Sequence, residues 1–158
     1  MVEAAESGDY VTALRLWRPL AAQGHAYAQY NLGGMYHQGQ GVPRDYAEAA
    51  KWFRLSAEQG YSQAQYNVGV MYGEGRGVPQ NNVQAHMWLS LAASRSPPGE
   101  LRYMAVKARD LIAERMTPAQ IVEAQKLTRE WHPRGEQALA HQELRALAKR
   151  VRTILRKM

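Results

Sequence analysis

Residues 28–36 read Ala-Gln-Tyr-Asn-Leu-Gly-Gly-Met-Tyr, and residues 64–72 read Ala-Gln-Tyr-Asn-Val-Gly-Val-Met-Tyr. The two stretches lie 36 residues apart, and the same offset relates Gly-Gln-Gly-Val-Pro at 39–43 to Gly-Arg-Gly-Val-Pro at 75–79. A fixed period of this length is typical of a solenoid, in which each unit buries its apolar face against its neighbours. The repeat therefore predicts a stacked, all-α scaffold, and it makes a catalytic pocket a secondary expectation.

Each unit is predicted to be a helix, a glycine loop and a second helix. Gly33 in the first helix lets another helix approach closely, while Gly39 suits a left-handed cap and Pro43 prevents the first helix from continuing. Asp45 with Glu48 predicts a capping box at the start of the second helix, and the pair one period later repeats it. The apolar residues of the first helix share one helical face: Ala28, Leu32, Met35 and Tyr36.

The spacing of these residues resembles a known family. The pattern Ala-x3-Leu-Gly-x2-Tyr-x2-Gly-x-Gly-Val-Pro, followed by Asp-x3-Ala-x2-Trp and Ala-x2-Gly, is similar to the Sel-1-like repeat, a relative of the tetratricopeptide repeat, in its bacterial form. The likeness covers residues 9–96, with Asn81 in place of the usual Asp and Ser96 in place of the terminal Gly. It implies a right-handed α-solenoid of stacked helix pairs.

The solenoid is expected to carry further elements at both ends. Residues 9–23 align with the second helix of an earlier unit, of which only residues 2–7 remain as a first helix. Trp52 and Trp88 occupy equivalent positions and are predicted to face the seams between units, Trp88 against the elements that follow. The expected segments are a partial tetratricopeptide-like unit at 1–24, repeats at 25–60 and 61–96, a capping helix pair at 97–131, and a basic amphipathic helix at 132–158.

The capping pair is predicted from breaks and apolar spacing after the repeats. Pro97 and Gly99 interrupt the pattern, and Thr117-Pro118-Ala119-Gln120 is typical of a helix start. Such a pair would cover the exposed end of the array, as solenoids require for solubility. The apolar positions of the two helices are Leu101, Met104, Ala105, Ala108, Leu111, Ile112 and Met116, then Ile121, Ala124, Leu127 and Trp131.

The charge of +6 is confined to the C-terminus, because residues 1–144 hold equal numbers of basic and acidic side chains. Apolar residues between Gln137 and Met158 fall at helical spacing: Leu144, Leu147, Val151, Ile154 and Met158. Three interpretations remain open for this helix: a packed terminal helix with a solvated cationic face, a helix that docks on an anionic membrane or an acidic partner, and a nucleic-acid contact. Nucleic acid is the weakest, since no aromatic residue interleaves with the basic ones.

The sequence offers little support for catalysis. It contains no cysteine, and its five histidines share no metal-ligand spacing. Gly73-Glu74-Gly75-Arg76-Gly77 follows a predicted helix rather than a strand, so it indicates a turn and not a phosphate loop. We therefore expect a non-catalytic scaffold with no cofactor and no metal, which binds a protein or peptide and not nucleic acid.

The family resemblance indicates where such a partner binds. In tetratricopeptide relatives the first helices line the concave face, and Asn31 and Asn67 occupy the position that grips the backbone of an extended peptide. The alternative is that the Tyr and Asn residues tie adjacent repeats together. The candidate partner-binding residues are Tyr27, Tyr30, Asn31, His37, Gln38, Gln63, Tyr66, Asn67 and Glu74.

The N-terminal sequence carries no clear targeting signal. Residues 1–6 lack the basic and apolar regions of a signal peptide. The bacterial relatives often carry signal peptides, which implies export to the periplasm or secretion. If Met1 is the native start, the protein is expected to be cytoplasmic.

Overall fold

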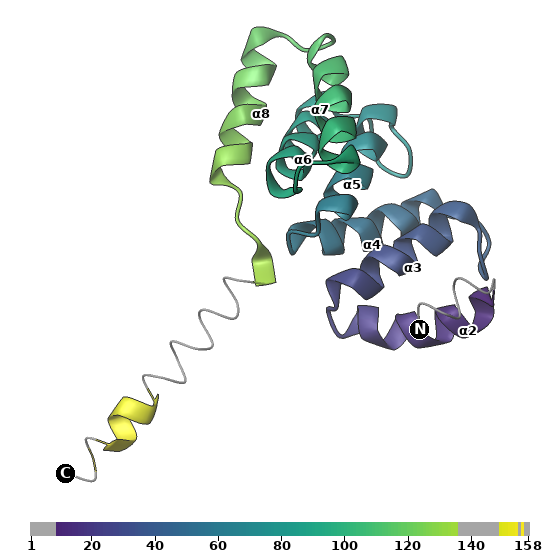
Figure 1. Cartoon of the computed structure of the whole chain (residues 1–158), viewed down its shortest axis with the longest axis vertical. Helices are drawn as coiled ribbons and strands as arrows, with labels where there is room; N and C mark the ends of the chain where they lie inside the picture. The colour runs from purple at the N-terminus through teal and green to yellow at the C-terminus, as the bar shows by residue number, and fades with distance from the viewer. Residues whose placement is uncertain (1–8, 136–148, 155, 157–158) are drawn as a thin grey trace.

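A computed structural model describes residues 9–135, 149–154 and 156, and Figure 1 shows these residues as a stack of helices. The expected first helix at residues 2–7 lies outside the described residues. Residues 9–135 contain no strand and form an all-α solenoid. Its helices are α2 (Tyr10–Ala22), α3 (Ala26–Gln38), α4 (Tyr46–Glu58), α5 (Ser62–Glu74), α6 (Asn82–Arg95), α7 (Glu100–Ala113) and α8 (Pro118–Glu130).

The helix ends follow the predicted signals, except that the N-cap amides of α4 and α6 bond to a carbonyl of the preceding helix. Gly39 and Gly75 end α3 and α5 in the left-handed region, at φ 69° and 67°. Asp45 caps α4 by accepting from the Glu48 amide at 3.0 Å. The reciprocal half of the predicted capping box is wrong here, because the Asp45 amide donates instead to the Tyr36 carbonyl at 2.9 Å. The N-cap residue thus ties the second helix of the unit to the first.

Close approach of helices within a unit depends on glycine, as predicted. A Cβ atom added at Gly33 would lie 2.7 Å from the Phe53 ring, and one added at Gly69 would lie 2.7 Å from Leu89. Both distances are far below van der Waals contact. A larger residue at either position would therefore force the facing side chain or its helix to move.

The glycine loops pack on the preceding unit. A Cβ atom at Gly41 would lie 2.9 Å from the Tyr10 carbonyl oxygen, and one at Gly77 would meet the backbone of Tyr46. Tyr10 and Tyr46 begin α2 and α4, the second helices of successive units. Each loop therefore lies on the start of the second helix of the unit before it.

The core runs along the stack in contiguous clusters. One centres on Leu32 between α2 and α3, and the larger one extends from Phe53 through Leu89 to Met116. Trp88 is 3% exposed and contacts Trp131 with ring centroids 6.1 Å apart, whereas Trp52 is only partly buried. The same repeat position is therefore more deeply covered at the C-terminal end of the array.

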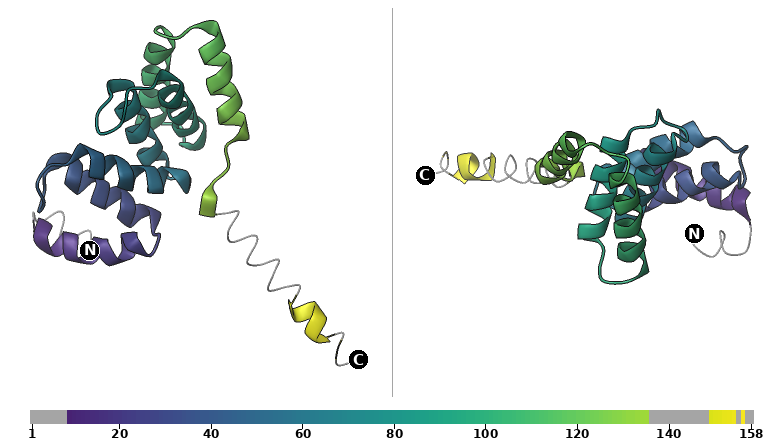
Figure 2. Two further views of the ribbon diagram at one scale, coloured as in Figure 1. Left: turned by 180° about the vertical axis from the view of Figure 1, so that it is seen from behind. Right: turned by 90° about the horizontal axis from the view of Figure 1, so that it is seen from above.

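The helices α7 and α8 both pack on α6 and make few contacts with each other. Figures 1 and 2 show them splayed apart over that helix. Ala105, Ile112 and Ala124 are buried as predicted. The prediction was wrong for Leu111 and Met104, which are 52% and 36% exposed, because nothing in the described residues covers the outer face of α7.

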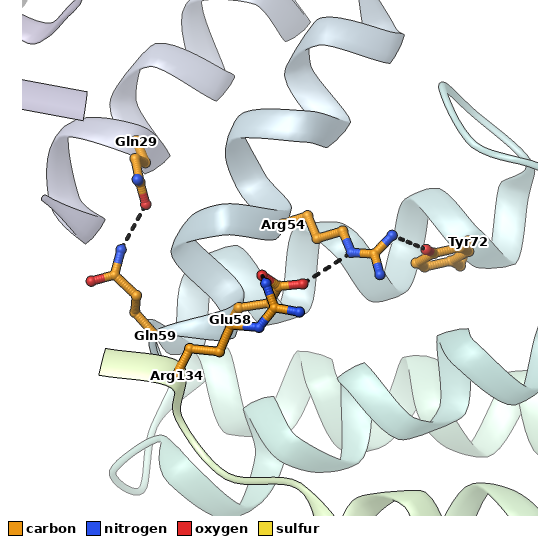
Figure 3. A network of polar contacts seen from close by, with 6 residues as sticks. All are labelled: Gln29, Arg54, Glu58, Gln59, Tyr72 and Arg134. Carbon is orange, nitrogen blue, oxygen red and sulfur yellow. Dashed lines mark hydrogen bonds and ion pairs between the residues drawn. The ribbon is translucent and has the colours of Figure 1, made fainter. Parts of the chain in front are cut away.

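A polar network ties the segment after α8 back to the repeats (Figure 3). Glu58 accepts from Arg54 Nε at 3.2 Å and pairs with Arg134 Nη1 at 3.0 Å, and Arg54 also reaches the Tyr72 hydroxyl at 3.4 Å. In the same view Gln59 Nε2 donates to Gln29 Oε1 at 2.8 Å. These contacts join α4 to α3, to α5 and to the chain beyond α8.

The described part of the C-terminal segment is helical and lies away from α2–α8 (Figure 1). Val151 and Ile154 are 47% and 60% exposed. A packed terminal helix would bury these two side chains. The rest of the predicted helix, with Leu144, Leu147 and Met158, lies outside the described residues. None of the described helices is long and apolar enough to cross a membrane.

Candidate functional site

The first helices of the two complete repeats line a groove with a volume of about 520 Å³. α3 contributes Tyr30, Asn31 and Gly34, and α5 contributes Tyr66, Asn67 and Val70. These residues recur one period apart because both helices present the same face. Further side chains close the groove at its ends and floor: Tyr10, Trp17, Met35, His37, Gln38, Gln40, Phe53, Met71, Glu74 and Arg76.

Seven of the nine predicted residues line this groove, and two do not. Tyr27 lies outside it and packs edge-on against Trp17, with ring centroids 5.4 Å apart. Gln63 lines a separate cleft with Pro97 and accepts from the Tyr61 hydroxyl at 3.1 Å. Tyr27 and Gln63 are equivalent positions in the first turns of α3 and α5, so the groove runs along the later turns of the two helices.

Tyr30 joins the two repeats as well as lining the groove. Its ring lies 5.1 Å from that of Tyr61 and 5.8 Å from that of Phe53, and a side-chain hydrogen bond joins its hydroxyl to Asn67. Burial raises the pKa of Tyr30, and the hydrogen bond to Asn67 partly offsets that rise. The contact supports the interpretation that these Tyr and Asn residues tie adjacent repeats together.

Asn31 and Tyr66, the repeat equivalents of Asn67 and Tyr30, lie in different environments from those two residues. Asn31 Nδ2 donates to the Tyr27 carbonyl at 2.7 Å, within its own helix. This bond fixes the amide plane and leaves the side-chain oxygen as an acceptor. Burial raises the pKa of Tyr66, and the nearby Glu74 carboxylate adds to the rise. The groove therefore presents neutral hydroxyl and amide groups beside aromatic surface.

One end of the groove carries charged side chains around an aromatic cluster. The His37 ring lies 5.2 Å from that of Tyr46, and the Arg76 guanidinium lies 5.0 Å from the same Tyr46 ring. Arg76 also pairs with Glu74 at 3.7 Å. Burial lowers the pKa of His37, and the Arg76 and Arg44 charges lower it further while Glu74 opposes them. His37 is therefore mostly neutral at pH 7, and Glu74 offsets one of the two guanidinium charges at this end of the groove.

Sequence reasoning missed Tyr10, Gln40 and Arg76. Gln40 Nε2 donates to the Tyr10 hydroxyl at 3.2 Å, so α2 and the first glycine loop close one end of the groove together. A signal was available, since Gln40 and Arg76 are the variable residues between the paired loop glycines. Tyr10 lies one unit earlier, and only the stacking of α2 on α3 places it here.

The floor of the groove has free space at Gly34. A Cβ atom built there would meet nothing within 4 Å, in contrast to the crowded Gly33 beside it. The groove can therefore accept side chains of another molecule next to Gly34. No group of three or more metal-ligating residues occurs in the described part of the chain.

Comparison with known proteins identifies the architecture. A family model described as Sel1 repeat matches residues 4–25, 26–61 and 62–97. The crystal structure of c5321, a protective antigen of uropathogenic Escherichia coli with an SLR fold, is 32% identical over 84% of this chain, with a TM-score of 0.71. A Sel1 repeat protein from Oxalobacter formigenes is 34% identical over 64% of the chain, with a TM-score of 0.58.

This chain spans 28% of the length of each of those two structures. No curated protein matches the sequence significantly. Proteins built from Sel1 repeats generally mediate protein–protein interactions, and they are typically non-catalytic scaffolds. The repeat matches cover more than half of the residues, and the chain belongs to the Sel1 repeat family.

Proposed function

We propose that this chain is a non-catalytic interaction module that binds an extended segment of a partner protein in the groove between α3 and α5. The observation that carries the proposal is the periodic arrangement of Tyr30, Asn31, Tyr66 and Asn67 along one groove. Flat aromatic rings offer contact area at low conformational cost, and amides can pair with a partner's backbone.

A test must separate partner binding from the structural role of the groove residues. Tyr30 packs against Phe53 and Tyr61, so Tyr30→Ala would lower stability as well as affinity. Gly34 provides a cleaner site, because a side chain there enters the groove and not the core. Gly34→Phe should fill the groove, whereas Gly34→Ala should leave most of it open and strengthen α3 by up to ~1 kcal/mol.

The experiment selects binders to the unmodified chain from a random peptide library and measures their affinity for both variants. We expect Gly34→Ala to keep the affinity and Gly34→Phe to reduce it at least about tenfold, with helical circular dichroism unchanged in both. Equal affinity for the two folded variants would show that peptides bind elsewhere.

A second candidate function rests on the exposed C-terminal helix. Val151 and Ile154 are exposed at i and i+3, and they stand among Lys149, Arg150 and Arg156. A basic helix with an exposed apolar face is suited to the surface of an anionic membrane. We infer that this helix docks there while the repeats hold a partner.

Vesicle co-sedimentation tests the second candidate in the full chain. Val151→Asp with Ile154→Asp should abolish binding to phosphatidylserine vesicles at low salt, and neutral phosphatidylcholine vesicles should not bind either protein. A double variant that sediments like the unmodified chain would rule out docking through this apolar face. A 1–136 truncation that aggregates would instead indicate a structural cap.

A further inference from the structure

The splayed arrangement of α7 and α8 leaves a cleft over α6, between the last Sel1 repeat and the two helices that follow it. Its volume is about 500 Å³. The lining residues come from three helices. They are His86 and Ser90 of α6, Arg109 and Asp110 of α7, and Gln125, Thr128 and Arg129 of α8. Every residue that lines this cleft is polar or charged, unlike the groove between α3 and α5.

The cleft contains more hydrogen-bond donors than acceptors. Arg109 donates from Nε and Nη2 to Asp110 Oδ1, each at 3.1 Å, so one of the two carboxylate oxygens in the cleft is already paired. Thr128 donates to the Ala124 carbonyl at 2.8 Å. Arg129 and Gln125 make no hydrogen bond or ion pair within residues 9–135, so their N–H groups are available to a ligand. Two guanidinium groups and one carboxylate leave the cleft with a positive charge.

His86 makes this cleft more than an exposed cluster of arginines. It is 6% exposed, and Ser90 Oγ lies 3.4 Å from its Nδ1. Its Nε2 has no hydrogen-bond partner in the described part of the chain. Burial lowers the pKa of His86, the Arg109 charge lowers it further, and Asp110 opposes them. The neutral imidazole is therefore favoured, and its unpartnered Nε2 can exchange a hydrogen bond with a ligand in the cleft.

We propose that the cleft between α6, α7 and α8 binds a phosphate group, either free or in a small soluble ester. A tetrahedral oxyanion accepts many hydrogen bonds and pairs well with arginine. In the cleft it would accept from Arg129 and Gln125 and lie beside His86. The site is independent of the partner-binding groove, so the scaffold would have a second, small-molecule ligand.

The test follows the His86 ring by NMR in the full chain while inorganic phosphate is added at constant pH and ionic strength. The His86 signal is assigned with His86→Gln. We expect a saturable shift of the His86 ring protons with phosphate and none with chloride. Glycerol phosphate, as a second probe, should bind more tightly than phosphate if the natural ligand is an ester, and more weakly if it is the free ion.

Matched arginine variants separate the cleft from general cationic attraction. Arg129→Gln should weaken phosphate binding at least about tenfold, because a charged hydrogen bond is lost. Arg115→Gln removes an exposed charge that does not line the cleft, and it should change the affinity less than about twofold. Gln125→Leu gives an independent check if Arg129→Gln alters the circular dichroism spectrum. A shift that never saturates, or an equal effect of Arg115→Gln and Arg129→Gln, would overturn the proposal.

Discussion

The repeats at 26–61 and 62–97 have the same helix–loop–helix backbone, but the side-chain contacts at their C-terminal ends differ. Gln29 and Gln65 each donate to a carbonyl of the preceding helix, at 3.1 and 3.2 Å. Gln29 Oε1 also accepts from Gln59, whereas buried Gln65 Oε1 has no partner in the described residues. The residue one period after Gln59 is Arg95, and its guanidinium lies over the Trp131 ring, 5.2 Å from the centroid.

The tryptophans show the same contrast. Trp52 is partly buried, with the Lys51 ammonium 5.5 Å from its ring centroid, while Trp88 is buried against Trp131. The residues that recur every 36 positions therefore determine the packing inside each repeat. The element that follows a repeat determines what the last residues of that repeat contact. A solenoid with nearest-neighbour coupling should be most sensitive where the neighbour is not another repeat.

The largest effect should come from Trp88. Trp88→Ala removes a fully buried ring and should cost ~3–5 kcal/mol of unfolding free energy, and Trp52→Ala should cost less. Loss of the Trp131 contact should also uncouple α8 and expose the end of the array. Urea unfolding measures the stabilities, and light scattering should show more self-association for Trp88→Ala than for Trp52→Ala. Equal or reversed scattering at matched loss of stability would show that residues 97–131 are not a cap.

The next effect concerns the helix contacts inside each repeat. Gly33→Ala and Gly69→Ala should each cost ~1–3 kcal/mol by overpacking, less the gain in helix propensity. Gly69→Ala should cost more, because the Leu89 backbone nitrogen lies 3.2 Å from the added Cβ, whereas the three atoms nearest to the Cβ added at Gly33 all belong to the Phe53 ring. Thermal unfolding with Gly34→Ala as the control measures the difference. A larger loss for Gly33→Ala would mean that the ring cannot move aside.

A smaller effect separates the two buried glutamines. Gln29→Met removes two hydrogen bonds, the one to the Ala21 carbonyl and the one from Gln59, which should cost ~1–3 kcal/mol. Gln65→Met removes only the hydrogen bond to the Ala57 carbonyl, together with an oxygen that is already unpaired, and should cost less. Denaturant midpoints of the two variants give the comparison. Equal losses would indicate that Gln65 Oε1 is satisfied in solution.

The smallest effect is on pH dependence. The pKa values of His37 and His86 are lowered in the folded chain, chiefly by burial. The unfolded chain therefore binds more protons, and the stabilising contribution is present above the unfolded value of about 6.5 and lost as pH falls through and below it. Unfolding curves between pH 7.5 and 5.5 should show a smaller loss in His86→Gln than in the unmodified chain. An unchanged slope in His86→Gln would contradict the assignment of the lowered pKa.

Much of the fold was predictable because the repeat carries its own local signals. The left-handed Gly39 and Gly75, the packing of Gly33 and Gly69, and the buried face of α3 were all expected from sequence and are confirmed. At α4 the N-cap bond of Asp45 was predicted correctly and the reciprocal bond of the capping box incorrectly, since a sequence pattern does not reveal that the Asp45 amide is already bonded to Tyr36. Such competition between partners is decided only by tertiary structure.

The site was predictable in part, for a similar reason. Periodicity identified the face of α3 and α5 but not how far along the helices the groove extends, so Tyr27 and Gln63 were included and Tyr10 was missed. The cleft beside His86 had no sequence signal. It depends on α7 and α8 packing separately on α6, which no local pattern encodes.

The central claim, that the groove between α3 and α5 binds a partner segment, is tested most directly by mapping a library-selected peptide on the isotope-labelled full chain by NMR. The claim predicts that the largest amide shift changes cluster at Asn31, Gly34, Asn67 and Val70, and that Gly34→Phe abolishes them. Changes confined to α7, α8 or residues 149–156, with the groove signals unmoved, would contradict it.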